Sequence, residues 1–198
     1  MHRVAVFLDY QNVLNGARAC FHSRPHSSWD GQVDPLALGR LLVARRPWPS
    51  ELAEVRVYRG LPDATRDPRT HAAHQRQTSA WTRSGHVRVL ARPLRYPRGW
   101  PAVRPQEKGV DVALAVDVVR LAVEGAYDVG IVMSTDTDLV PALEAAVALG
   151  VHVEVAAWAG PSANRRLSLG GDLPWCHHLR RDDYLATHDP TDYARPGP

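Results

Sequence analysis

Two apolar segments that lie far apart in the chain each run directly into acidic residues. Residues 4–8 (VAVFL) are followed by Asp9, and residues 131–133 (IVM) lead into Asp136 and Asp138. Branched apolar runs of this length are typical of buried strands. In an open α/β sheet, ligands gather outside the carboxyl ends of the parallel strands. The sequence therefore predicts a sheet that brings these carboxylates to one edge.

Segments typical of strands alternate with segments typical of helices along the chain. Asp34-Pro35 and Asp67-Pro68 are helix-start signals, because an aspartate caps the first turn and a proline fits inside it. This alternation predicts right-handed crossovers and a mainly parallel α/β sheet of five strands in the order 3-2-1-4-5. Strands one and four would then be neighbours where the winding reverses. The expected strands are residues 3–8, 55–58, 87–90, 129–133 and 151–157. The first expected helix begins at residue 35, and the others cover 68–84, 109–124, 139–149 and, as a short last helix, 162–169.

Length and composition indicate one globular domain with a short extension. The chain has 198 residues, of which 44% are hydrophobic and 23% are charged. No apolar stretch approaches the roughly 18 residues that a membrane span requires, and the N-terminus does not read as a secretory signal. Two cysteines make no disulfide framework, so a cytoplasmic location is expected. We expect a domain over residues 1–160 and a C-terminal extension over 161–198 that packs on it and has a flexible end.

The extension carries a cluster of aromatic, thiol and imidazole groups at Trp175, Cys176, His177 and His178. A zinc site is disfavoured, because no second cysteine lies nearby. We expect instead a strand or helix that packs Trp175 on the core.

A third acidic position, Asp111, follows Lys108 at the start of a helical segment. Asp9, Asp111 and Asp136 would converge in the predicted sheet, and Asp138 would lie close by. Such acids cannot all stay ionised unless something neutralises them. Oxygen ligands favour Mg²⁺ or Mn²⁺ over zinc, and these ions commonly serve phosphoryl chemistry. The simpler alternative is that these acids only stabilise helix N-termini, with Asp9 and Asp138 as caps.

Polar residues accompany these acids. Asn12 lies one helical turn after Asp9, where its amide can orient a carboxylate, a water or a substrate phosphate. Ser134 and Thr135 offer hydroxyl groups at the exit of the fourth strand. Asp117 falls on an otherwise apolar helical stripe, and a buried acid is costly unless it is paired. It therefore either pairs with a nearby arginine or borders the metal site.

Residues 7–12 (FLDYQN), 108–111 (KGVD) and 134–139 (STDTDL) form three motifs in a defined order. Together they resemble the NYN domain family of the PIN-like nuclease superfamily, over about residues 3–157. The resemblance implies a Rossmann-like three-layer sandwich and a ribonuclease that depends on Mg²⁺ or Mn²⁺. It also implies metal ligands at Asp9, Asp111 and Asp136 with Asn12 as their polar partner, and it matches Asp138 and Asp117 to acids that recur in the family.

The segment 92–104 combines arginines with aromatic residues directly before Lys108. An RNA substrate needs positive charge for its phosphates and stacking surfaces for unpaired bases. We expect Lys108 and Ser134 to contact the substrate, although the segment could equally be a solvated proline-rich loop. A second basic stretch, 66–76, reads as a solvated helix face. The candidate contacts within the first segment are Arg92, Arg95, Tyr96, Arg98 and Trp100.

The leading hypothesis is a hydrolase, an endoribonuclease that cleaves single-stranded or structured RNA by in-line attack of an activated water. The alternative is a non-catalytic RNA-binding or protein-interaction module that keeps the PIN-like fold. A phosphatase of the aspartyl-phosphate type is disfavoured, because Gln11 stands where a second aspartate is expected. A DNA nuclease would use the same metal chemistry. The sequence leaves a monomer and a homodimer equally open.

Overall fold

Six parallel strands form one sheet in the order β3-β2-β1-β4-β5-β6. The computed structural model describes residues 1–22, 24, 27, 29–160, 167–169 and 173–195. The predicted order of the first five strands is confirmed, and the predicted number is wrong by one, because β6 extends the sheet beyond β5. The strands are β1 (His2–Asp9), β2 (Ser50–Leu61), β3 (Val87–Pro93), β4 (Val129–Met133), β5 (His152–Trp158) and β6 (Cys176–Leu179).

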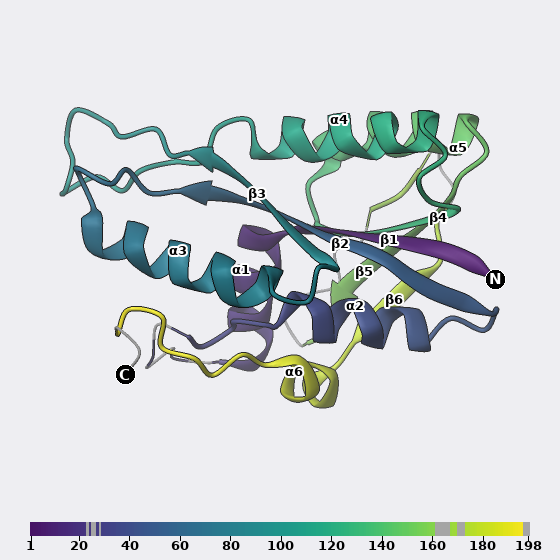
Figure 1. Cartoon of the computed structure of the whole chain (residues 1–198), viewed down its shortest axis with the longest axis horizontal. Helices are drawn as coiled ribbons and strands as arrows, with labels where there is room; N and C mark the ends of the chain where they lie inside the picture. The colour runs from purple at the N-terminus through teal and green to yellow at the C-terminus, as the bar shows by residue number, and fades with distance from the viewer. Residues whose placement is uncertain (23, 25–26, 28, 161–166, 170–172, 196–198) are drawn as a thin grey trace.

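Helices cover both faces of this sheet (Figure 1). Those that carry the second and third acidic motifs lie on one face, and the remaining helices lie on the other. The resulting three layers are those of the expected α/β sandwich. The first group is α4 (Val110–Val123), η1 (Thr137–Leu139) and α5 (Val140–Ala148), and the second is α1 (Tyr10–Phe21), α2 (Pro35–Ala44), α3 (Pro68–Thr82) and α6 (Arg181–Thr187).

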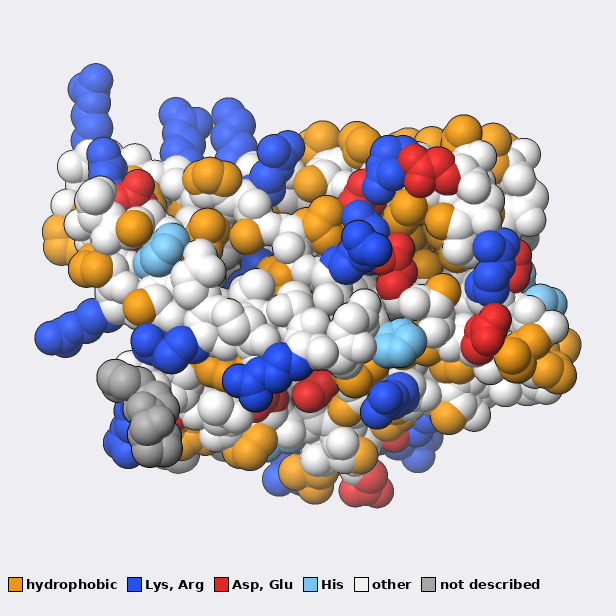
Figure 2. Space-filling view, viewed as in Figure 1, with side chains coloured by type: hydrophobic (Ala, Val, Ile, Leu, Met, Phe, Trp, Pro, Cys, Tyr) orange, Lys and Arg blue, Asp and Glu red, His pale blue; other side chains and the backbone are white. Residues whose placement is uncertain are grey.

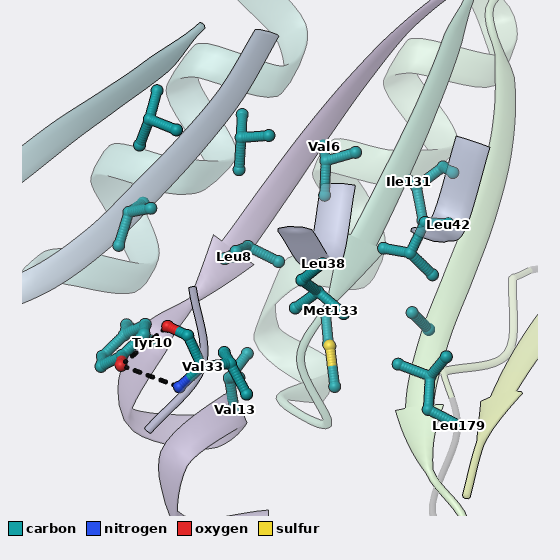
Figure 3. Close-up of a cluster of buried hydrophobic side chains, with 14 of the residues drawn as sticks. Val6, Leu8, Tyr10, Val13, Val33, Leu38, Leu42, Ile131, Met133 and Leu179 are labelled. Atoms are coloured by element: carbon teal, nitrogen blue, oxygen red, sulfur yellow. Dashed lines mark hydrogen bonds between the residues drawn. The ribbon is translucent and has the colours of Figure 1, made fainter. Parts of the chain in front are cut away.

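The central strand β1 contributes to two apolar cores. Val6 and Leu8 pack in the cluster formed with α1 and α2 (Figure 3), whereas Phe7 packs in the cluster that includes Leu114 of α4. A strand buried on both faces reads as a continuous apolar run, which is why β1 was recognisable in the sequence. β1 pairs with β4 such that Leu8 stands opposite Met133. The two strands therefore deliver their following residues to the same edge.

Three of the four candidate aspartate caps are correct. Asp9 caps α1, and Asp34 and Asp67 cap α2 and α3, each with a proline in the first turn. The prediction that Asp138 is an N-cap is wrong. Asp136 is the cap of η1, because its Oδ1 accepts a hydrogen bond from the backbone N–H of Asp138 at 3.0 Å. The short 3-10 turn then leads into α5 at Val140.

The C-terminal extension adds a strand and a helix to the domain. β6 pairs with β5, and α6 packs on the face that also carries α2. The prediction that Trp175 packs on the core is wrong, since 53% of Trp175 is exposed. His177 is buried instead, and its Nε2 lies 2.7 Å from a carboxylate oxygen of Glu154. Most of the helix expected over 162–169 lies outside the described residues, and the boundary at residue 160 stays a prediction.

No helix in the part of the chain that the structure describes combines the length and the apolar character needed to cross a membrane.

Candidate metal centre

Asp9 lies at the carboxyl end of β1 and caps α1. Its Oδ1 accepts the backbone N–H of Asn12 at 3.2 Å, and its Oδ2 accepts the Asn12 side-chain amide at 2.5 Å. The hydroxyl of Ser134 donates to the same Oδ2 at 3.1 Å. Only 7% of Asp9 is exposed, and this burial raises the pKa of its carboxyl group, with a smaller contribution from the negative charge of Asp136.

Ser134 links the first acidic motif to the third. Its Oγ donates to Asp9 and accepts the backbone N–H of Asp136 at 3.1 Å. The neighbouring Thr135 hydroxyl donates to the Asn12 side-chain oxygen at 2.8 Å. The turns that follow β1 and β4 are therefore held together by side-chain hydrogen bonds across 125 and 123 positions of sequence. This explains why the predicted polar partners, Asn12 and the two hydroxyl residues, lie beside the acids.

Three carboxylates from two elements form the centre of the site. Asp111, Asp136 and Asp138 each offer an oxygen, and these oxygens all lie within 4.8 Å of one another. Asp111 lies in the first turn of α4, which starts after Gly109 in a left-handed conformation with φ 73°. Asp111 and Asp136 are half-buried and Asp138 is exposed. A set of carboxylate oxygens at this spacing suits a hard divalent cation such as Mg²⁺ or Mn²⁺.

Glu107 is a further acidic neighbour of the site that sequence analysis missed. Its Oε1 accepts the backbone N–H of Gly60 at 2.6 Å. Partial burial raises the pKa of the Glu107 carboxyl group, and the charges of Asp9 and Asp111 raise it further. A β-carbon on Gly60 would lie 2.9 Å from Glu107 Cγ, so the bare backbone of β2 permits this close approach. The signal was present, because Glu107 directly precedes Lys108 in the second motif.

A sequence model of the NYN domain matches residues 3–169. The chain belongs to the NYN domain family. This membership places it in the PIN-like nuclease superfamily, as the three motifs suggested. A crystal structure of a protein of unknown function from Vibrio parahaemolyticus is similar at 20% sequence identity, with a TM-score of 0.50 over 78% of this chain and 80% of that chain. At this identity the similarity concerns the fold.

A second solved structure, of a Glycyrrhiza uralensis protein in complex with glycyrrhetinic acid 3-O-monoglucuronide, matches at 16% identity over 79% of this chain and 28% of that chain. Its TM-score of 0.33 is too low to support an argument. A comparison with curated proteins gives no match.

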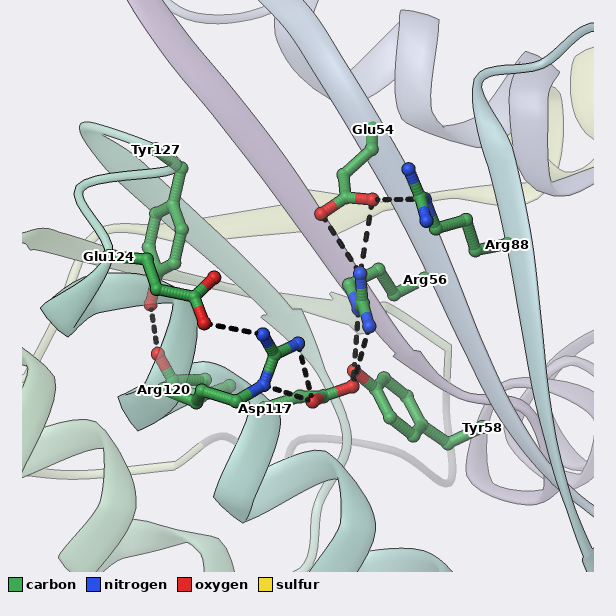
Figure 4. A network of polar contacts seen from close by, with 9 residues as sticks. Glu54, Arg56, Tyr58, Arg88, Asp117, Arg120, Glu124 and Tyr127 are labelled. Atoms are coloured by element: carbon green, nitrogen blue, oxygen red, sulfur yellow. Dashed lines mark hydrogen bonds and ion pairs between the residues drawn. The ribbon is translucent and has the colours of Figure 1, made fainter.

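Asp117 of this NYN domain lies in a separate polar network (Figure 4). Its Oδ2 accepts hydrogen bonds from Arg56 at 2.7 Å and from the Tyr58 hydroxyl at 2.9 Å, and its Oδ1 accepts from Arg120 at 3.0 Å. Burial alone would raise the pKa of Asp117, but these hydrogen bonds outweigh it and lower the pKa. Among the described residues, Asp117 is not part of the acidic group formed by Asp111, Asp136 and Asp138. The geometry therefore favours the arginine-paired alternative over a role as a metal ligand.

The arginine-rich segment before the second motif is more ordered than a solvated loop. An antiparallel bridge joins Arg95 to Gln106, and the rings of Tyr96 and Trp100 meet edge to face with centroids 5.0 Å apart. The Tyr96 hydroxyl also accepts the backbone N–H of Asp63 at 3.0 Å. The basic groups stay at the surface, and Figure 2 shows lysine and arginine side chains that project around this end of the molecule. The exposed basic residues in question are Arg92, Arg95, Arg98, Arg104 and Lys108.

A cavity of about 350 Å³ opens beside the acids, between α1 and the carboxyl ends of β4 and β5. Asn12, Ser134 and Thr135 contribute polar groups to its lining, and Met133 and Trp158 contribute apolar surface. It therefore combines hydrogen-bonding groups with an apolar wall directly next to Asp9.

Proposed function

We propose that this NYN domain is a metal-dependent ribonuclease, an endoribonuclease that hydrolyses RNA phosphodiesters with Mg²⁺ or Mn²⁺. The convergence of Asp111, Asp136 and Asp138 within 4.8 Å carries this proposal. Asp9 supports it, because a hydrogen-bonded serine joins its carboxylate to the turn that holds Asp136. Membership of a nuclease superfamily points to the same chemistry.

Asp111 and Asp136 would hold the ion, with Asp138 beside them and Asp9 adjoining through Ser134. When bound, the ion supplies charge neutralisation for the phosphate and a more acidic water for in-line attack. The protein's own contribution is orientation. Asn12 fixes Asp9 through two hydrogen bonds, and Thr135 fixes Asn12 in turn. These contacts hold the carboxylates in place before the substrate arrives, which reduces the cost of organising them during the reaction.

We propose RNA as the substrate on the basis of the surface around the acids. The exposed basic groups of residues 92–104 and Lys108 would neutralise phosphates. Tyr96 and Trp100 would offer ring surface to unpaired bases, in the manner of single-stranded RNA sites. Ser134 and the cavity beside it would take part of the nucleotide next to the scissile phosphate. A cytoplasmic location belongs to the same proposal, and it agrees with Cys20 and Cys176, neither of which forms a disulfide in the described part of the chain.

The test is cleavage of a mixture of unstructured and hairpin RNAs by the purified protein, with Mn²⁺, Mg²⁺ or a chelator. Asp136→Asn should reduce the rate at least about 100-fold, since loss of even an outer-shell partner of a metal site costs 10–100-fold. Asp182→Asn is the matched control, because Asp182 is an exposed first-turn acid of α6. A parallel reaction on DNA of the same sequence tests the choice of nucleic acid.

Cleavage that survives in chelator, or that Asp136→Asn leaves intact, would overturn the proposed mechanism. RNA binding without cleavage under every metal condition would favour the non-catalytic binding module instead.

A further inference from the structure

A second and larger cavity lies on the other side of β1 from α4, between α1 and α3. Its volume is about 800 Å³, and its lining includes Tyr10, Arg59, Arg69, His74, Arg76 and Gln77. It adjoins the acidic centre along two neighbouring strands. Tyr10 directly follows Asp9, and Gly60, which follows Arg59, donates its N–H to Glu107. The basic stretch 66–76, which the sequence assigned to a solvated helix face, lines this cavity in part.

Arg59 brings a buried positive charge to the cavity without an ion-pair partner among the described residues, and the carboxylate of Glu107 acts on it only from a greater distance. Its exposed fraction is 7%. Its guanidinium group bonds only neutral partners, the Gln77 side-chain oxygen at 2.5 Å and His74 Nε2 at 2.9 Å, and it lies over the rings of Tyr10 and Trp81 at 5.2 and 5.5 Å. Within the described residues, no carboxylate lies within 4.0 Å of it. A charge buried in this way is costly unless another charge offsets it.

Two polar atoms beside the cavity are left without a hydrogen-bond partner. They are Nε of Arg59 and Nδ1 of His74, both buried. Burial and the positive charge of Arg59 lower the pKa of His74 to about 3, so this imidazole is neutral at physiological pH. Buried polar groups are ordinarily paired, so two unpaired nitrogens beside one cavity leave hydrogen-bonding capacity for a group bound there.

Two more arginines line the same cavity. Arg69 is exposed near its rim, and Arg76 donates to the backbone oxygens of Tyr193 and Ala194 at 2.8 and 3.3 Å. None of the described residues that line the cavity carries a carboxylate, so the formal charges of its lining are all positive. The cavity is large enough for a phosphate with its attached sugar.

We propose that this cavity binds a phosphate group of the RNA strand, adjacent to the phosphate that is cleaved. The inference rests on the proposed function, because it takes the cavity's ligand to be the same RNA. A strand that places one phosphate at the acidic centre presents further phosphates on either side, and a neighbouring pocket with three arginines offers them charge-assisted hydrogen bonds. Arg59 is buried without an ion-pair partner among the described residues, and an anion bound in the cavity would supply one.

The test measures RNA affinity by fluorescence anisotropy at several salt concentrations. The protein carries Asp136→Asn throughout, so that the RNA stays intact. Arg69→Gln should weaken binding about tenfold, since it removes a charge-assisted hydrogen bond to a phosphate. It should also reduce the slope of log affinity against log salt by about 1. Arg83→Gln is the matched control, because Arg83 is an exposed arginine at the end of the same helix and does not line the cavity.

Arg59→Met tests the buried charge itself. It should weaken RNA binding while the melting temperature of the free protein stays equal or rises, because the substitution removes a charge that is buried without an ion-pair partner among the described residues. Should Arg59→Met fail to fold, Arg69→Gln still decides the matter. Oligonucleotides with a 5′-phosphate or a 5′-hydroxyl group distinguish a terminal phosphate from an internal one, and only a terminal-phosphate site would prefer the former.

The inference is wrong if Arg69→Gln binds RNA with the affinity and salt slope of Arg83→Gln, or if the protein binds no RNA. Its failure is separable from that of the proposed function. If Arg69→Gln has no effect on RNA binding but metal-dependent cleavage is present, the proposed phosphate site is wrong and the proposed nuclease function stands. If RNA binding depends on Arg69 but the protein never cleaves RNA, the phosphate site stands and the nuclease function is wrong.

Discussion

Substitution of Asp117 by asparagine separates a structural acid from a catalytic one. Asp117 has 11% of its side chain exposed, and its main partner Arg56 has 8% exposed. Removal of one partner from a buried ion pair typically costs about 3–5 kcal/mol. Here Glu54 lies 3.1 Å from Arg56 and continues to neutralise it, and the ion pair with the half-exposed Arg120 is screened by solvent. We therefore expect Asp117→Asn to lower the free energy of unfolding by about 2–3 kcal/mol.

The pH dependence of this loss follows from the lowered pKa of Asp117. A carboxyl group with a depressed folded-state pKa stabilises the protein fully above its unfolded-state pKa, which is about 4. That contribution disappears as pH falls through the folded-state value. The difference in unfolding free energy between the wild type and Asp117→Asn should thus be constant from pH 5 to 7 and shrink below about pH 4.

Urea denaturation at each pH measures the loss of unfolding free energy. RNA cleavage is measured on the same protein preparations at a temperature below their melting transition. The matched comparison is Asp138→Asn, since Asp138 is exposed and belongs to the acidic group. Asp138→Asn should impair cleavage and leave stability within about 0.5 kcal/mol of the wild type. The reasoning is refuted if Asp117→Asn retains full stability but loses metal-dependent cleavage, because Asp117 would then act as a ligand.

Three further substitutions test a buried ion pair of the fold and the surroundings of the acidic site. Glu154→Gln should destabilise the protein by about 3–5 kcal/mol in urea denaturation, because it leaves Arg46 without its carboxylate partner in a fully buried pair; an unchanged unfolding midpoint would contradict this. Gly60→Ala should lower the free energy of unfolding by about 1–3 kcal/mol through overpacking and should also slow RNA cleavage, since the added methyl group would lie 2.2 Å from Leu94 and 2.9 Å from Glu107. Wild-type stability and cleavage rate would contradict this, because they would show that Leu94 and Glu107 move aside without cost. Glu107→Gln should make the chelator-treated protein more stable at pH 7, because the raised pKa of the Glu107 carboxyl group means that the folded protein disfavours its charged form. The gain in stability should vanish as pH falls, and a lower melting temperature of the variant at pH 7 would contradict this prediction.

The sheet was predictable because its signals are local. β1 and β4 are short apolar runs buried on both faces, and the crossover rule orders such strands with few alternatives. The convergence of Asp111 with Asp136 followed from this order, since each stands at the end of the sheet where the carboxyl ends of the strands meet. β6 was not resolved from the sequence, because Cys176–Leu179 is only four residues long and two of these are histidines.

Side-chain partners were less accessible to sequence analysis, because they depend on which groups meet across the fold. A cap at Asp136 and a cap at Asp138 are equally consistent with the local sequence, and only the backbone path of η1 decides between them. Glu107 approaches the other acids because Gly60, 47 positions away, leaves room for it. The burial of Arg59 likewise depends on α3 folding over β2, which a count of arginines cannot reveal.

The most direct test of the central claim is a titration of the chelator-treated protein with Mn²⁺, followed by the electron paramagnetic resonance signal of the free ion. We expect saturable binding to the wild type, the same binding to Asp182→Asn, and a loss of at least about tenfold in affinity in Asp111→Asn and in Asp136→Asn. If the wild type binds no Mn²⁺, or if all four proteins bind it equally, Asp111 of α4 and Asp136 at the start of η1 do not form a metal centre.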